Sequence, residues 1–496
     1  IAIAVYGLII FLVLLGTFIE ICLNFQKQST NDEKEAKSCV TEVLLCFSVL
    51  RNTRELFLVK QKRSNLSVVH GIRVLSMIWI IVGHTYLFGT VYRMLYTFRR
   101  LQVDIPKYPG RIQYQALNNS YLCVDSFFFI SGLVLVYVSL PLLKKTGGKF
   151  NYLLYIAHRW LRMTPALIGL ILFIYLFPFF GSGPVFKHHV NPYVNSCERN
   201  WWYDLLFISN WYQDIPGMCA EQVWFIGADF QIYIFAPLIF LLYNRSEKKG
   251  LIVNIVVLLI GIVSSGISVY VTDSQATFTL DHYSKDDKKP NIPIVLQILM
   301  WIILPSASLY AMFSTYRWNN YLESSQPSLF TTITFAALQR SLWCIGIAWI
   351  TFTCAVGRGS IVNDFLSANV FVPFSRLSFC VFLMHLSPIL LRAFSVKFTR
   401  NWDDHTFVSI AHFSMQRIHF CFCFQLSWAA MNVILSTLAA FALYTLFEAP
   451  FQRLEKMVFR SNDCQRKQHS ANNELRTANV ECSERSTQKS STSMRL

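Results

Sequence analysis

Ten apolar stretches separated by polar segments run along the 496-residue chain. The first, Ile1–Leu23, contains a single charged residue, and a helix of that length crosses a hydrocarbon core about 30 Å thick at about 1.5 Å per residue. Placed by apolar length and flanking charge, the other predicted spans are Gly71–Tyr92, Tyr121–Leu142, Met163–Phe180, Val223–Tyr243, Leu251–Val271, Ile294–Phe313, Phe330–Val356, Phe371–Ala393 and Leu426–Phe447. The pattern therefore predicts an all-α fold, a polytopic bundle of about ten transmembrane helices.

The composition agrees with lipid as the solvent. Only 15% of the residues are charged, whereas a soluble globular protein usually carries about 25%. The formal net charge of +16 comes mostly from Lys and Arg beside the apolar stretches, where the positive-inside bias and anionic lipid headgroups favour them. We interpret this charge as a signal of topology and predict no nucleic-acid partner. We expect an integral, multi-pass protein of the plasma membrane or an endomembrane.

The flanking charges also orient the chain. The segment 24–65 is rich in Lys and Arg, so we predict a cytosolic linker between the first two spans. Ten spans with an external start place the tail 460–496 outside, whereas the basic residues from Lys456 onward favour the cytosol. We therefore expect one crossing to be missing from this count, within Thr279–Leu329. The tail is polar and we expect it to be disordered. Because the chain begins with Ile inside an apolar stretch, we expect a piece of a longer protein.

The predicted external segments hold two candidate modification sites. Asn118 begins the sequon Asn118-Asn119-Ser120, which marks it as a candidate glycosylation site. Cys197 and Cys219 lie in the same external segment and are a candidate disulfide, since oxidising compartments favour such pairs; the alternative is two free thiols. The thirteen cysteines are scattered and form no CxxC pair, so we predict no metal site.

Two ionisable residues, Arg73 and His84, lie in the second predicted span. They are eleven residues apart, which at about 100° per residue is within roughly 20° of a whole number of turns, so they share one helix face. Their axial separation is about 16 Å, which places Arg73 near the cytosolic interface and His84 beyond the bilayer midplane. Taken singly, Arg73 is an interfacial anchor and His84 a packed polar group. Taken together, they favour a substrate that lies along the helix.

Arg159 and Arg162 stand three residues apart just before the fourth predicted span, on one face of the helix that enters it. With Arg73 at the same cytosolic level, their guanidinium groups are suited to bind phosphates. The alternative interpretation is ordinary positive-inside charge.

Helix depth places two carboxylates near the level of His84. Asp125 and Asp229 each lie a few residues inside a span from its external end, and either is a candidate to orient the imidazole and raise its basicity. Asp125 has a simpler alternative, as the cap of its helix. His385 is a second intramembrane histidine, which we interpret as a packing residue.

Several segments, taken as a set, resemble one family. The Arg73-to-His84 spacing and Arg159-Trp160-Leu161-Arg162 match two motifs of the membrane acyltransferase 3 family, Arg, ten residues, His and Arg-x-x-Arg. Other segments similar to the animal branch named nose resistant to fluoxetine are His70-Gly71-Ile72-Arg73-Val74-Leu75-Ser76-Met77, Gly83-His84-Thr85-Tyr86, Val124-Asp125-Ser126-Phe127-Phe128-Phe129-Ile130-Ser131-Gly132, Ser375-Arg376-Leu377-Ser378 before His385, and Phe447-Glu448-Ala449-Pro450 before Leu454-Glu455-Lys456.

The resemblance covers about Leu66 to Phe459 and does not include the branch's extracellular N-terminal domain. Together with the apolar and charged pattern it predicts four parts: an N-terminal transmembrane helix 1–23, the cytosolic linker 24–65, an acyltransferase 3-like membrane domain 66–459, and the disordered polar tail 460–496.

The resemblance also implies an activity. An acyl group would pass from a cytosolic donor such as acyl-CoA to a hydroxyl of a lipid or small-molecule acceptor. His84 would act as the general base with help from Asp125 or Asp229, and the three arginines would bind the donor. No bound cofactor is expected, and acyl-CoA would be a co-substrate.

Two other functions are alternatives to acyl transfer. Intramembrane charges also line the passages of transporters and lipid- or drug-handling proteins that carry out no chemistry. A receptor-like helical scaffold accounts for the number of spans, but it gives no reason for Arg73 and His84 to share a face.

Overall fold

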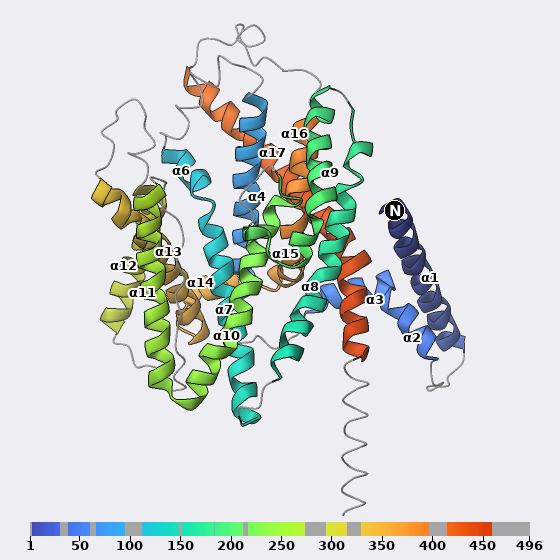
Figure 1. Ribbon diagram of the computed structural model, residues 1–496, viewed down its shortest axis with the longest axis horizontal. Helices are drawn as coiled ribbons and strands as arrows, with labels where there is room; N and C mark the ends of the chain where they lie inside the picture. The colour runs from blue at the N-terminus through green and yellow to red at the C-terminus, as the bar shows by residue number, and fades with distance from the viewer. Residues whose placement is uncertain are drawn as a thin grey trace, which may run out of the picture.

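The structure, a computed structural model, describes residues 2–29, 38–59, 66–94, 112–147, 151–182, 184–211, 217–272, 294–314, 329–395 and 414–458. Within these ranges all regular secondary structure is helical (Figure 1), which confirms the predicted all-α fold. The long helices are α1 (Ala2–Ser29), α4 (Val68–Met94), α7 (Leu122–Lys145), α8 (Tyr152–Ile174), α9 (Pro184–Leu205), α10 (Trp224–Arg245), α11 (Glu247–Thr272), α12 (Ile294–Phe313), α13 (Leu329–Ala355) and α17 (Ser414–Leu443). The shorter elements are α2 (Cys39–Cys46), α3 (Val49–Phe57), α6 (Ile112–Asn118), α14 (Ser360–Leu366), α15 (Phe371–Met384), α16 (Leu386–Phe394), the 3-10 turns η2 (Phe177–Phe179), η3 (Ser209–Trp211) and η5 (Glu221–Val223), and the π-helical turn η8 (Tyr444–Glu448).

The described helices include six that are long and apolar enough to cross a membrane. The pair α14 and α15, bent by 61°, makes a seventh if it counts as one span. The chain is therefore a multi-pass integral membrane protein, with fewer clear crossings than the ten predicted. The other predicted spans are helical too, but α8 carries Arg159 and Arg162 in its first half, and Phe371–Ala393 is divided between α15 and α16. Most of Thr279–Leu329 outside α12, and the whole tail 460–496, lie outside the described residues.

The bundle is built around α4. Its neighbours are α7, α15, α16 and α17, and Figure 1 shows α4 near the middle of the molecule, with α11, α12 and α13 grouped at one edge and α1 to α3 at the other. A buried apolar cluster connects these central helices and includes Ile81, Leu170, Cys380 and Leu443. The polar residues of α4 therefore lie among protein helices.

Two glycines of α4 permit close contacts with its neighbours. A Cβ atom at Gly71 would overlap the backbone of Leu366 in α14, and one at Gly83 would overlap the side chain of Ser120, just before α7. Small residues allow helices to approach closely in membranes. These contacts hold α4 on both sides of the segment from Arg73 to His84.

The turn between α7 and α8 sets where α8 begins. After α7 ends at Lys145, Gly147 adopts a positive φ of 62°, a conformation that a residue without Cβ reaches at little cost. The side chain of Asn151 then accepts a hydrogen bond from the Leu154 amide at 3.1 Å and caps the start of α8. This turn fixes the depth of the arginines that α8 carries.

Helix α1 is docked on the membrane domain by polar contacts as well as apolar ones. The Tyr6 hydroxyl donates a hydrogen bond of 2.7 Å to the Gly169 carbonyl of α8. The buried carboxylate of Glu20 accepts a hydrogen bond from Ser48 and lies 3.8 Å from the Arg51 guanidinium. A carboxylate inside an apolar helix is costly without such partners.

The predicted linker 24–65 contains the helices α2 and α3. The guanidinium of Arg376 on α15 donates to the carbonyls of Glu55, Leu56 and Leu58 at 2.7–2.8 Å. These carbonyls belong to the end of α3, where helix carbonyls have no partner within the helix. Arg376 thereby joins the linker to the membrane domain.

Helix α9 holds a disulfide and a buried carboxyl group. Cys197 of α9 forms a disulfide with Cys219, in the segment just before η5. Asp204, in the last turn of α9, is 1% exposed and lies beside Ser209 and the Ala220 amide. α9 is half polar and is not among the candidate spans. Burial raises the pKa of Asp204 to about 7, although the hydrogen bonds from Ser209 and the Ala220 amide act to lower it.

Because of Asp204, we expect the stability of the folded protein to depend on pH. The pKa of Asp204 is higher in the folded state, so between about pH 4 and pH 7 the folded protein keeps this proton while the unfolded chain releases it. The contribution of this group to the free energy of unfolding is therefore complete below about pH 4 and is lost as the pH rises to about 7. The loss over this range is on the order of 4 kcal/mol, since the pKa rises by about 3 units and each unit is about 1.4 kcal/mol. Asp204→Asn should remove this dependence. The check is the unfolding midpoint of detergent-solubilised protein at pH 5 and pH 8; an equal shift in both proteins would contradict it.

Candidate functional site

Arg73 and His84 are placed by one helix. Both lie in α4, Arg73 in its second turn and His84 about three turns further along, and both side chains are partly buried. An unbroken α-helix between them keeps the two on one face, about 16 Å apart along the axis. The unbroken helix that the predicted spacing of Arg73 and His84 requires is therefore present in the structure.

Three arginines and one carboxylate gather near the start of α4. Arg73 is within electrostatic reach of Arg162 on α8 and of Asp229 on α10. Asp229 forms an ion pair with Arg159, and the guanidinium carbon of Arg159 lies 4.2 Å from the ring centroid of Tyr233. The structure therefore brings together Arg73, Arg159 and Arg162, as the sequence suggested.

The charges in this group do not cancel, because three guanidinium groups face two carboxylates, Asp229 and, within electrostatic reach of Arg162, Glu448. Asp229 is the ion-pair partner of Arg159, whereas Arg73 and Arg162 form no ion pair or hydrogen bond within the part of the chain that the structure describes. Unpaired positive charge is unfavourable inside a membrane domain unless water or an anion reaches it. Two unpaired guanidinium groups beside an ion pair are suited to bind a phosphate or a carboxylate.

Asp229 does not lie against His84, which corrects one expectation. Its carboxylate is paired with Arg159, in the arginine group. The expected depth of Asp229 requires that α10 start at the external surface. In the structure α9, η3 and η5 precede α10, and Asp229 meets Arg159, in the first half of α8.

Asp125 also contacts an arginine and not His84. Its Oδ1 lies 3.2 Å from Nη1 of Arg340 on α13, and each side chain is 2% exposed. The Arg340 guanidinium also lies over the Tyr121 ring, with 5.4 Å from Cζ to the centroid. A buried carboxylate requires a compensating charge, and Arg340, far away in sequence, provides it. This pair ties α7 to α13.

The ring that contacts His84 belongs to His385. The His84 Nδ1 and His385 Nε2 atoms are 3.1 Å apart, and the ring centroids 5.0 Å. Phe88, one turn further along α4, stacks on the His84 ring, with 5.7 Å between the ring centroids. The interpretation of His385 as a packing residue was therefore incomplete, because His385 is fully buried against the candidate base.

A second set of hydrogen bonds begins at Thr85, the residue after His84 on α4. Asn432 on α17 donates to the hydroxyl of Thr85 at 3.0 Å and accepts a hydrogen bond from Arg392 on α16 at 3.1 Å. The Arg392 guanidinium carbon lies 4.8 Å from the Trp428 ring centroid. The imidazole of His84 thus has the arginine group on one side along α4 and a hydrogen-bonded polar chain on the other.

Glu448, from the segment Phe447-Glu448-Ala449-Pro450, lies in the π-helical turn η8. Its carboxylate accepts hydrogen bonds from the Cys380 thiol and the Gln452 amide, both at 2.8 Å, and it is within electrostatic reach of Arg162. Its position next to the arginine group gives this segment a structural connection to the site.

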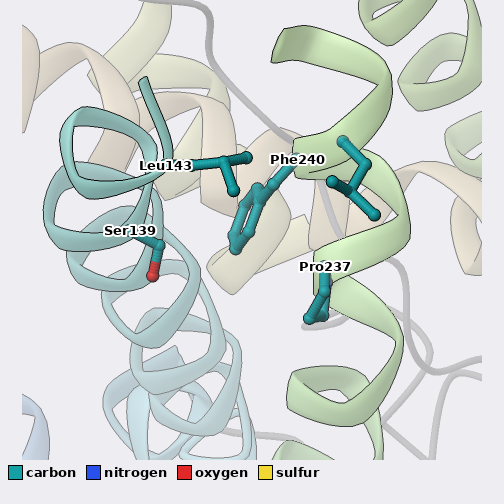
Figure 2. A pocket seen from close by; sticks show the side chains of 5 residues that line it. Ser139, Leu143, Pro237 and Phe240 are labelled. Atoms are coloured by element: carbon teal, nitrogen blue, oxygen red, sulfur yellow. The ribbon is translucent and has the colours of Figure 1, made fainter. Parts of the chain in front are cut away.

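The groove in Figure 2 is not part of this site. It lies between α7 and α10, is lined by Ser139, Leu143, Pro237, Phe240 and Leu241, and has a volume of about 10 Å³. That is room for about one water molecule.

Two further predictions concern modification and metals. Asn118 is half-buried at the end of α6, and its glycosylation stays a prediction. Among the described residues no group of three His, Cys, Asp or Glu side chains is arranged to hold a metal ion.

Comparison with known proteins identifies the family. A sequence profile described as an acyltransferase domain matches residues 67–447, more than half of the chain. The chain belongs to the acyltransferase 3 family. The matched range begins just before α4 and ends in η8, so it contains the arginine group, His84 and His385.

Relatives of this acyltransferase 3 protein come from animals and bacteria. "Nose resistant to fluoxetine protein 6" of Caenorhabditis elegans is 24% identical over 92% of this chain and 60% of its own length. "Regulator of hypoxia-inducible factor 1" of the same organism is 27% identical over 45% of this chain and 43% of its own length. A Staphylococcus aureus protein, whose name gives O-acetyltransferase as a provisional activity, is 22% identical over 38% of this chain and 31% of its own length. The chain thus spans 60% or less of each of these relatives, and no solved structure matches it.

Proposed function

We propose that this chain transfers an acyl group from an anionic activated donor, which enters from the cytosolic side, to a hydroxyl group of a lipid or small-molecule acceptor. The observation that carries the proposal is the single face of α4, with unpaired positive charge at one end and an imidazole about 16 Å further along. Membership of the acyltransferase 3 family supports the reaction class.

The arginine group forms the donor end of the site. Arg73 and Arg162 bind the donor's anionic groups, and Asp229 holds Arg159 beside them. Acyl-CoA is the donor we expect, since its phosphates suit guanidinium groups and its acyl arm is long enough to extend along α4. The names of the relatives specify no donor, so other anionic acyl donors belong in the same test.

His84 forms the reacting end. Its unprotonated ring nitrogen takes the proton from the acceptor hydroxyl, and the oxygen attacks the carbonyl carbon of the donor. A carbon–oxygen bond forms, the bond from the carbonyl carbon to the leaving sulfur breaks, and the proton passes from the imidazolium to the departing thiolate. A positioned base of this kind contributes about 10²–10⁴-fold to a rate.

The test is covalent turnover by purified protein. Protein reconstituted in liposomes is incubated with isotope-labelled acyl-CoA or another labelled acyl donor and a mixture of hydroxyl-bearing lipids and small molecules. Mass spectrometry should find the labelled acyl group attached to an acceptor. Movement of a labelled compound across the membrane without any new covalent bond would overturn the proposal and favour a transporter.

Removal of the unpaired arginine charges should weaken donor binding. Arg73→Gln and Arg162→Gln should each raise the donor KM by about 10-fold to 100-fold, since a hydrogen bond to a charged group contributes about 1.5–3 kcal/mol. kcat should change far less. Initial rates over a range of donor concentrations measure both constants.

Arg245→Gln is the matched control for these variants. Arg245 is an exposed arginine in the last turn of α10, away from the arginine group, and its substitution should leave the donor KM unchanged. Equal KM values for all three variants would contradict the assignment of the donor end.

A further inference from the structure

His385, which contacts His84, lies at a break between two helices. α15 ends at Met384 and α16 begins at Leu386, with His385 at the junction. Pro388 explains the break, because a proline has no amide hydrogen and its ring clashes with the carbonyl four residues earlier, here that of Met384. The helix is therefore interrupted at the residue that meets the candidate base.

Three main-chain carbonyls around the break have side-chain partners, which come from η5, from α17 and from His385 itself. Gln222 of η5 donates to the Leu383 carbonyl at 2.7 Å, and Ser436 of α17 donates to the His385 carbonyl at 3.5 Å. The Phe382 carbonyl lies 2.6 Å from Nδ1 of the His385 ring. The imidazole of His385 is thus held by the backbone of its own helix.

These contacts determine the protons on both rings. A carbonyl oxygen only accepts hydrogen bonds, so Nδ1 of His385 carries the hydrogen that bonds to Phe382. Nε2 of a neutral His385 then has a lone pair and accepts a hydrogen bond from Nδ1 of His84. A neutral His84 with its hydrogen on Nδ1 has its lone pair on Nε2. The His84 ring also meets the Ile80 carbonyl one turn earlier on α4, and a carbonyl only accepts, so a hydrogen on the His84 ring serves this contact as well. With that hydrogen on Nδ1, Nε2 is the nitrogen of His84 that takes a proton.

We propose that His385 is a positioning residue, which fixes the tautomer and orientation of His84 so that Nε2 is the basic nitrogen. The inference rests on the proposed function, because it assigns a role within acyl transfer. After proton transfer, His84 is an imidazolium, and its Nδ1–H bond to His385 becomes charge-assisted and therefore stronger. His385 thus stabilises His84 more in the charged form than in the neutral form, without touching the substrate.

Two substitutions separate this role from packing. His385→Gln keeps an acceptor near the position of Nε2, within reach of His84. His385→Asn keeps a donor near the position of Nδ1, which bonds to Phe382, but leaves His84 without its acceptor. Asn should lower kcat about 100-fold with the donor KM within about 2-fold of wild type, and Gln should stay within about 10-fold of the wild-type kcat.

The controls separate this proposal from the proposed function. Both variants are compared with wild type by unfolding midpoint and size-exclusion profile. A second measurement adds His385→Asn to His84→Ala, where the proposal expects no further loss, because His385 acts only through His84. Wild type without acyl transfer overturns the proposed function. Wild type that is active, with Asn and Gln variants equal in kcat or with additive losses in the double variant, overturns the positioning role alone.

Discussion

Replacement of His84 by alanine is expected to lower kcat for acyl transfer by about 10²–10⁴-fold, the contribution of a positioned general base. The donor KM should change little, because the arginine group about 16 Å away remains intact. The measurement is product formation by mass spectrometry, with protein reconstituted in liposomes and wild-type and variant protein at matched concentrations.

A histidine outside the site provides the control. His158 on α8 has a side chain that is 56% exposed and lies 3.4 Å from Glu455. His158→Ala should retain wild-type kcat. If His84→Ala transferred the acyl group at the wild-type rate, the proposed mechanism would be refuted even though the chain belongs to the acyltransferase 3 family.

The sequence predicted those features that depend on one helix. The face shared by Arg73 and His84 follows from the spacing along an unbroken helix, and the all-α class follows from the lengths of the apolar stretches. The Arg159-to-Arg162 spacing gave a common face on α8. The meeting of that face with Arg73 was an extrapolation from depth, and packing of α8 near α4 makes it correct.

The sequence did not predict which groups meet across helices. Depth along the helices predicts Asp125 and Asp229 near His84, but depth does not specify direction around a helix. Each carboxylate pairs with an arginine, and Arg340 lies 215 residues from Asp125 in sequence. A buried carboxylate needs a partner, but which side chain provides it depends on how the helices pack.

The role of His385 was also hidden by a local feature. Phe371–Ala393 reads as one apolar span, and a straight helix gives no reason for His385 to meet His84. Pro388 was the available signal, because it predicts a break near Met384. Breaks in membrane helices place free carbonyls inside the protein, where polar side chains gather around them.

The second large effect is expected at the buried pair of Asp125 and Arg340. Asp125→Asn or Arg340→Met alone should destabilise the folded protein by about 3–5 kcal/mol, because either change leaves one buried charge without its partner. The double variant should recover most of this loss, since it buries no charge. The unfolding midpoint of detergent-solubilised protein measures all three, and Lys456→Gln, at a residue 70% exposed, should change the stability by less than about 1 kcal/mol.

The same double variant also decides between two roles for Asp125. If the carboxylate only compensates Arg340, the double variant should regain acyl transfer together with stability, because neither residue contacts His84. If Asp125 takes part in catalysis, the double variant should be stable but inactive. A double variant as unstable as the sum of the single changes would show that the two charges do not compensate each other, and the link between α7 and α13 would then need another cause.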